Sequence, residues 1–454
     1  MFCAFLMQAQ EKYAVLITGD YASSNFINRQ NINIWNGGFD RAAMEEFWND
    51  TFLMWEMLVD EFGYNPDNDF VLFADGVDYS NAGSRYKKYD DNNQYVNIVY
   101  DEASTISVEN IFTDLRYGTN GRPQITDDDF LFVWTFDHGY YGSSNSYLCL
   151  LDGNMSDEEF ADLVNPIPAY KKVFWMQQCN SGGFADDLEN YNVYFSSAAQ
   201  YNQSAYRADN RTINNNTVEE NELVNNRTYY HGEYDFHIYS STRGESPNYV
   251  NNYYGISYTN ADVNNDNIIS VTEAHDWNEN YNSRANETSV ESDLGEIGDY
   301  TSLKYPTTLY ENITSNKTYK SLIAVTKDIT ITDGNTLKFD ENSITYIINN
   351  STLTVSNNSE LECLGTLIIE DGGKLIIEDG GKLIYEQGTT ISLSEDNSYI
   401  EIAGDLHISD NATFTFSGDG YIKFSKPGTD TETQDNIIAG TNASFCFRRY
   451  RQKR

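Results

Sequence analysis

Near-continuous apolar runs recur along the first two thirds of the chain and predict strands buried on both faces, as in a parallel sheet covered by helices. The runs are YAVLITG (13–19), FVLFADG (70–76), FLFVWTFDHG (130–139), KVFWMQQC (172–179) and NVYFSSAA (192–199). Between them, residues 41–63 repeat large apolar side chains at the spacing of one helical face, and residues 156–164 begin with a capping-box signature. We therefore expect an α/β fold with a parallel sheet and helices on both of its faces.

The chain changes character at about residue 305, where short stretches of alternating apolar and polar residues begin. The segment TLIIEDGGKLIIEDGGKLIYEQGTTISL (366–393) repeats about every eight residues, with Leu367, Leu375 and Leu383 at one position of the repeat. Such alternation, with Gly-Gly at regular intervals, predicts short stacked strands, as in a β-solenoid or a flat all-β domain. The expected organisation is a signal-peptide remnant (1–10), an α/β domain (11–304), a β-rich repeat domain (305–440) and a basic tail (441–454).

Composition narrows the possible partners of this 454-residue chain, whose formal net charge at pH 7 is −40. The charge argues against nucleic-acid and anionic-membrane partners and favours hard cations such as calcium. Five cysteines without pair spacing predict no disulfide framework, and no apolar run reaches the roughly 18 residues of a membrane span. The beginning, MFCAFLMQAQEKYAVL, resembles the end of a secretory signal, so we expect a secreted or cell-surface protein.

Two of the predicted strands end on residues that can carry nucleophilic catalysis. His138 ends the run in WTFDHGYYG, and Cys179 ends KVFWMQQC immediately before Asn-Ser-Gly-Gly. Ligands of open α/β sheets bind beyond the carboxyl ends of parallel strands, so the two side chains converge if their strands are neighbours. The imidazole would then take the thiol proton, and the backbone N–H groups of Gly139 and Cys179 could form an oxyanion hole.

These motifs, followed by NVYFSSAA, resemble the legumain-type cysteine peptidases, which share the caspase-like fold. The resemblance covers residues 12–304 and implies that Cys179 is the nucleophile, His138 the catalytic histidine and Gly139 an oxyanion donor. The implied reaction is cleavage of protein or peptide substrates through a thioester acyl-enzyme, or transfer of that acyl group to an amine. We expect a monomer without an organic cofactor.

The positions that set substrate specificity in legumains differ in this chain. Counting back from Asp50, Glu46 stands where legumains have an arginine, and Gln177 stands where they have a glutamate. Glu233 of HGEYDF matches an acidic residue of the family. A pocket with Glu46 and Glu233 and no arginine predicts a basic residue at P1, the substrate residue before the cleaved bond, unless Arg41 supplies the missing charge.

The segment DVNNDNIISVTE (262–273) has the spacing of an EF-hand loop and predicts a structural calcium site. Position 6 of the loop is Asn267 in place of the usual glycine, which is tolerable because Asn can adopt the left-handed conformation. The expected ligands are Asp262, Asn264, Asp266, the backbone carbonyl of Ile268, Ser270 and Glu273.

Two alternatives remain open at this stage. The changes at the specificity positions are compatible with a catalytically inactive caspase-like scaffold that carries a β-solenoid adhesin, although the presence of both His138 and Cys179 favours an enzyme. CNSGGF (179–184) also resembles the metacaspases, which would predict an Arg/Lys-specific peptidase. Gln178 argues against this second alternative, because metacaspases have an aspartate at that position.

Overall fold

Two compact units make up the chain, as a computed structural model shows. The first, here called the α/β unit, comprises Glu11–Val263 and Ile269–Asp299, and the second, the repeat unit, comprises Asn264–Ile268 and the chain from Tyr300 on. The structure describes residues 11–19, 41–78, 86–142, 144–213, 216–219, 222–224, 227–244, 261–332, 334–341, 343–348, 350–386, 389–393, 397–408, 413–418, 421–424, 437–439 and 444–447.

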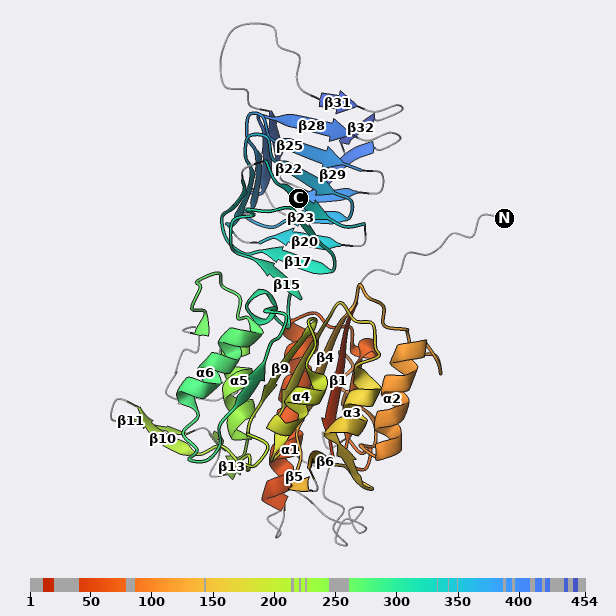
Figure 1. Cartoon of the computed structure of the whole chain (residues 1–454), viewed down its shortest axis with the longest axis vertical. Coiled ribbons are helices and arrows are strands. Elements are labelled where there is room, and N and C mark those ends of the chain that lie inside the picture. The colour runs from red at the N-terminus through yellow and green to blue at the C-terminus, as the bar shows by residue number, and fades with distance from the viewer. Residues whose placement is uncertain are drawn as a thin grey trace, which may run out of the picture. The chain divides into compact units, whose positions relative to one another are not determined.

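A seven-stranded sheet with the order β14-β9-β8-β4-β1-β2-β3 forms the centre of the α/β unit (Figure 1). Its strands are β1 Lys12–Thr18, β2 Asp69–Phe73, β3 Val99–Asp101, β4 Phe130–Thr135, β8 Lys171–Met176, β9 Val193–Ser197 and β14 Val290–Ser292. Each apolar run of the sequence supplies one strand of this sheet, and all pairs are parallel except that of β14 with β9. The predicted α/β class is therefore confirmed.

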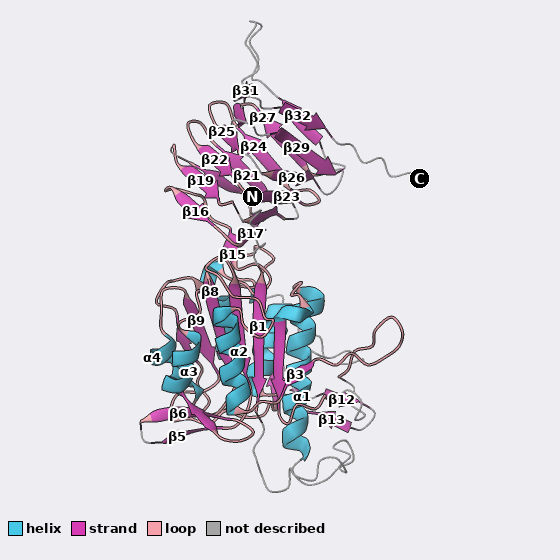
Figure 2. Ribbon diagram, turned by 90° about the vertical axis from the view of Figure 1, so that its right-hand side faces the viewer, coloured by secondary structure: helices cyan, strands magenta, loops and turns pink. Residues whose placement is uncertain are grey.

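Helices cover both faces of the sheet, which explains why its strands are apolar on both sides (Figure 2). On one face, α2 (Thr105–Tyr117), α3 (Asp157–Val164) and α4 (Ala185–Leu188) bury their apolar sides against the strands. The remaining helices are α1 Arg41–Glu56, which continues as a π-helical turn Met57–Glu61, α5 Glu233–Arg243 and α6 Val271–Tyr281. The helix predicted over 41–63 is thus present, and none of the helices described is long and apolar enough to cross a membrane.

Short antiparallel strands form three further elements of this unit, none of which the sequence pattern predicts. One three-stranded sheet consists of β5 Gly139–Gly142, β6 Asn145–Cys149 and β7 Asn154–Ser156. The other two are hairpins formed by β10 Asn210–Ile213 with β11 Asn216–Glu219, and by β12 Glu222–Val224 with β13 Arg227–Tyr229. Because β5 begins directly after His138, the first of these sheets bears on the candidate site.

The repeat unit consists of short strands that form three parallel sheets (Figure 2). The first strand, β15, pairs with β17, and from β16 on each strand pairs with the third strand after it, as far as the described strands extend. Along most strands the second and fourth residues point inward and are buried together, among them Leu367, Leu375 and Leu383. The strands are β15 Thr307–Leu309, β16 Lys317–Tyr319, β17 Leu322–Val325, β18 Ile329–Ile331, β19 Thr336–Phe339, β20 Ile344–Ile347, β21 Thr352–Val355, β22 Glu360–Cys363, β23 Thr366–Ile369, β24 Lys374–Ile377, β25 Lys382–Tyr385, β26 Thr390–Leu393, β27 Tyr399–Ile402, β28 Asp405–Ile408, β29 Thr413–Gly418, β30 Tyr421–Phe424, β31 Ile437–Ala439 and β32 Ser444–Phe447.

The Gly-Gly pair of the repeat has a separate steric role for each glycine. The first, Gly372, has a φ of 73°, a left-handed conformation that glycine adopts at little cost. The second, Gly373, lies so close to the preceding coil that a Cβ there would come within 2.6 Å of the Ile347 carbonyl oxygen. A tight corner and close stacking of backbones therefore explain why both glycines recur.

Candidate active site

His138 and Cys179 lie at the ends of neighbouring parallel strands. β4 and β8 pair in register through Thr135 and Met176, and each candidate follows the last paired residue of its strand by three positions. Gly139 lies against the cysteine, since a Cβ built on it would come within 2.2 Å of the Cys179 carbonyl oxygen. The structure thus brings the three predicted catalytic residues together at the sheet edge where open α/β folds bind their ligands.

The imidazole of His138 is exposed on one side and supported by an aromatic ring on another. It meets Phe47 of α1 edge to face, with ring centroids 5.7 Å apart, and its backbone N–H donates to the carboxylate of Asp137. Partial removal from water lowers the pKa of His138 below its usual value of 6.5. The ring is therefore neutral at pH 7 and can accept a proton from a neighbouring group.

Cys179 is a partly buried free cysteine at the start of a sharp turn. Its Sγ lies 3.7 Å from the carbonyl oxygen of Ala205, and Asn180 behind it has a left-handed φ of 63°. Gly182 has no room for a side chain, because a Cβ would come within 2.7 Å of Val290. The small residues after the cysteine therefore allow the chain to turn away at once, which keeps the thiol at the strand end accessible.

The backbone N–H of Gly139 points away from the neighbouring strand β6. The N–H of Cys149 donates to the His138 carbonyl at 3.0 Å, and the next pair along the ladder is Gly139 with Leu148. Hydrogen-bonded and non-hydrogen-bonded pairs alternate in an antiparallel ladder, so Gly139 belongs to a non-hydrogen-bonded pair. Its N–H is therefore not used by β6, as an oxyanion donor requires.

An arginine that the sequence analysis did not expect lies beside Glu46. Glu46 of α1 forms an ion pair with Arg207, which comes from the loop after β9. Burial acts to raise the pKa of Glu46, and the charge of Arg207 and its hydrogen bond oppose that rise. Arg41, the expected source of positive charge, has a side chain outside the described residues.

Gln177 and Glu233 are both buried and act in the framework next to the site. The amide oxygen of Gln177 accepts the N–H of Asp235 at 2.8 Å. Glu233 accepts the backbone N–H groups of Asp209 and Ser283, each at 3.1 Å. Because the guanidinium of Arg284 lies 3.9 Å from Glu233, this carboxylate also has an arginine beside it.

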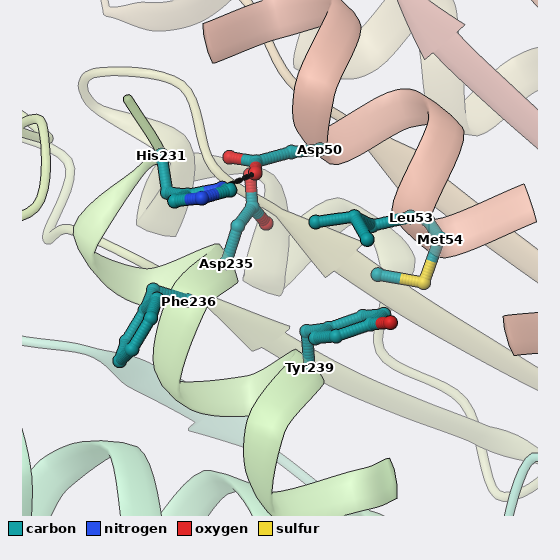
Figure 3. A pocket seen from close by; sticks show the side chains of 7 residues that line it. All are labelled: Asp50, Leu53, Met54, His231, Asp235, Phe236 and Tyr239. Carbon is teal, nitrogen blue, oxygen red and sulfur yellow. Dashed lines mark hydrogen bonds and ion pairs between the residues drawn. The ribbon is translucent and has the colours of Figure 1, made fainter. Parts of the chain in front are cut away.

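A buried polar cluster that the sequence did not predict links α1 to α5 (Figure 3). His231 is fully buried and its Nδ1 lies 2.5 Å from Asp50, which also accepts the Gly232 N–H at 2.7 Å. Asp235 accepts the indole N–H of Trp134 at 2.9 Å, and burial followed by the nearby Asp50 raises its pKa well above the usual value. The cavity among these residues has a volume of about 10 Å³, the room of roughly one water molecule.

The sequence analysis missed His231 and Arg207 as residues near the site. The sequence around His231 could have indicated its position, whereas the sequence around Arg207 could not. His231 immediately precedes Gly232 in the HGEYDF segment, so its place beside the specificity residues could have been inferred. Arg207 lies 161 residues from Glu46 along the chain, and nothing in its surroundings marks it. Only the fold brings these two charges together.

The residues of the predicted calcium loop are divided between the two units. In the repeat unit, Asp266 accepts the Ile268 N–H at 2.9 Å and the Thr326 hydroxyl at 2.7 Å, and Asn267 has the predicted left-handed φ, 65°. In the α/β unit, Glu273 forms a capping box with Ser270. No three His, Cys, Asp or Glu side chains gather as a metal site among the residues described, so the calcium site stays a prediction.

An α/β sheet with a cysteine and a histidine at adjacent strand ends is the arrangement of the caspase-like cysteine peptidases. Residues 47–223 match the family model of the Peptidase C13 family, the family of legumain, and the resemblance to legumain-type peptidases is thereby confirmed. The matched segment contains His138, Gly139 and Cys179 but not Glu46, Glu233 or the calcium loop. No curated protein matches the chain.

Proposed function

We propose that this protein is a cysteine endopeptidase in which Cys179 is the nucleophile and His138 the general base. The adjacency of the two strand ends carries the proposal. His138 takes the thiol proton, Sγ attacks the carbonyl carbon of the scissile bond, and His138 returns the proton to the leaving amine as the C–N bond breaks. Water, deprotonated by the same imidazole, then attacks the thioester, releasing the carboxylic acid product and the thiol. The N–H groups of Gly139 and Cys179 would stabilise the oxyanion at both steps.

Covalent labelling of the full chain with a thiolate-directed probe tests this proposal, and the other buried cysteines offer matched controls. Burial raises the pKa of Cys149 to about 12, and that of Cys363 likewise to about 12, so neither thiol is ionised at pH 7. We expect wild type, Cys149→Ala and Cys363→Ala to be labelled, and Cys179→Ala and His138→Ala not to be. Unchanged labelling of Cys179→Ala would overturn the proposal. Absence of labelling in wild type, with and without calcium, would favour the inactive scaffold.

The charges near Glu46 and Glu233 argue against the basic P1 preference expected from the sequence. Each carboxylate has an arginine beside it, so a basic P1 side chain would compete with Arg207 or Arg284 for its partner. We therefore propose that Glu46 serves to hold Arg207 in place. Probes with P1 Arg and P1 Asn test this on wild type and Arg207→Gln, and faster labelling of wild type by the P1 Arg probe would contradict it.

We further propose that the loop 262–273 binds calcium and thereby stabilises the protein. Its oxygen-rich spacing and the left-handed Asn267 support this. At 100 times the dissociation constant, a ligand that binds only the folded state stabilises it by about 2.7 kcal/mol. Calcium should therefore raise the melting temperature of wild type and of Asp276→Asn, a control on the exposed side of α6, but not of Glu273→Gln. Equal shifts in both variants would refute the site.

We infer that the repeat unit is a β-solenoid, because from β16 on the described strands pair with the third strand after them, so that three strands would form one coil. We propose that this unit serves for attachment. We also propose that the protein is secreted, on the strength of residues 1–10, which lie outside the described residues. Fractionation of producing cells tests the secretion, since recovery only from the cytoplasm would contradict it.

A further inference from the structure

A groove of about 440 Å³ lies in the α/β unit, and its lining includes residues that closely follow the nucleophile in the chain. Its size is within the range of sites that bind small ligands or peptide side chains. Gly182 and Gly183, directly behind Cys179, form part of its wall. Tyr141, three residues after His138, and Tyr201 form another part. Both catalytic strand ends thus lead into the groove.

One loop, which follows β9, runs past the three parts of the site in order. Near its beginning, the carbonyl oxygen of Tyr201 accepts the side-chain N–H of Asn180 at 2.7 Å. The Ala205 carbonyl then lies 3.7 Å from the Sγ of Cys179, and Arg207 pairs with Glu46 two residues further on. The sulfur therefore lies between the groove at one end and the Glu46–Arg207 pair at the other. If the Glu46–Arg207 end receives the residues before the scissile bond, the groove receives those after it.

The groove combines aromatic rings with negative charge. Tyr141 and Tyr201 are about half exposed and meet edge to face, with ring centroids 5.4 Å apart. Asp186 is exposed and Asp157 is buried in the same wall, and no lysine or arginine lines the groove among the residues described. The pKa of the adjacent Asp187 is raised, first by burial and then by the surrounding carboxylates. A cation is attracted both to the carboxylates and to the faces of tyrosine rings.

We propose that this groove binds the part of the peptide substrate that follows the scissile bond and selects a lysine or arginine side chain there. The proposal rests on the peptidase function proposed above. It differs from the preference at P1, because the selection acts on the leaving group and involves Asp186, Tyr141 and Tyr201.

Cleavage of quenched fluorescent peptides by the full chain tests the proposal. The peptides have identical residues before the cleaved bond and carry Lys, Ala or Glu at the second and third positions after it. An exposed ion pair and a cation–π contact each contribute up to about a fivefold effect. We expect kcat/KM for the Lys peptide to exceed that for the Ala peptide by about five- to tenfold, and the Glu peptide to be poorer than both. The ratio of kcat/KM for the Lys peptide to that for the Ala peptide should fall to about twofold in Asp186→Asn. In Tyr201→Phe the ratio should remain near the wild-type value, because the face of the aromatic ring is kept. Glu109→Gln, which removes an exposed charge on α2, is the control and should leave the ratio unchanged.

The inference and the proposed function can fail separately. If wild type is labelled at Cys179 and cleaves all three peptides equally, the groove proposal is wrong and the peptidase proposal stands. If wild type cleaves nothing, calorimetric titration of full-chain Cys179→Ala with Gly-Lys-Lys-Gly amide and Gly-Glu-Glu-Gly amide decides. Preferential binding of the lysine peptide, weakened by Asp186→Asn, would support the groove, and equal binding of the two peptides would overturn it.

Discussion

The α/β unit and the repeat unit use opposite means to hold their strands together. In the repeat unit, every strand pairs with a strand about one coil away, as Leu353 pairs with Leu375 and Leu361 with Leu383. In the α/β unit, the decisive contacts join residues far apart in sequence, such as Glu46 with Arg207. Local repetition makes strands whose surroundings are alike, whereas long-range convergence makes one edge of the α/β sheet unlike any other part.

This difference shows which positions of each unit are free to contact a ligand. The strands of the repeat unit have inward apolar positions, and the backbone makes close contacts at Gly373 and Gly381, so few positions there are free to vary. A strand end in an open sheet has no partner beyond it, so His138 and Cys179 can face a ligand. The candidate active site therefore lies in the α/β unit, whereas the repeat unit is the structurally regular part of the chain.

The largest expected effect comes from adding one methyl group at the edge of the α/β sheet. In Gly139→Ala the new Cβ would come within 2.2 Å of the Cys179 carbonyl oxygen, so the nucleophile and the oxyanion donor must move apart. A displacement of about 1 Å at a catalytic centre can cost about a hundredfold in rate, and we expect at least that loss in labelling rate or kcat/KM. Gly142→Ala, on the same strand, is the control, because its Cβ would make only ordinary contacts with the rings of Tyr140 at 3.4 Å and Tyr147 at 4.0 Å. Equal activities of the two variants would show that Gly139 is not tightly held.

A cavity in the repeat unit should destabilise that unit alone. Leu375 is fully buried between its counterparts in the adjoining coils, and Leu375→Ala should cost about 2–5 kcal/mol. Ile376 on the same strand points outward, so Ile376→Ala is the matched control and should cost much less. Hydrogen exchange by mass spectrometry would show lost protection within 307–408 while the protection of β1, β4 and β8 is kept. Loss of protection in those three strands as well would mean that the two units unfold as one.

The same contrast explains how much of the molecule could be predicted from its sequence. The apolar runs gave the central strands, and the eight-residue period gave the inward positions of the repeat, because both signals are local. The placement of His138 and Cys179 at neighbouring strand ends could be predicted, because each follows an apolar run. The Glu46–Arg207 pair and the β5–β6 hairpin could not, because one depends on packing of a distant loop and the other on four residues without a clear pattern.

A further expected effect is a pH dependence of the stability of the α/β unit. Burial raises the pKa of Glu287 to about 8, with the nearby Glu233 adding to the rise, whereas in the unfolded chain a glutamate titrates near 4.5. The protonated carboxyl therefore favours the folded state below pH 4.5, and this contribution is lost as the pH rises through about 8. Because one pKa unit corresponds to about 1.4 kcal/mol, urea unfolding should show lower stability at pH 8 than at pH 5. Glu287→Gln keeps the shape of the side chain without its charge. In this variant the stability of the α/β unit should depend less on pH. A wild type equally stable at both pH values would mean that Glu287 is charged in the folded protein and stabilised by Arg284.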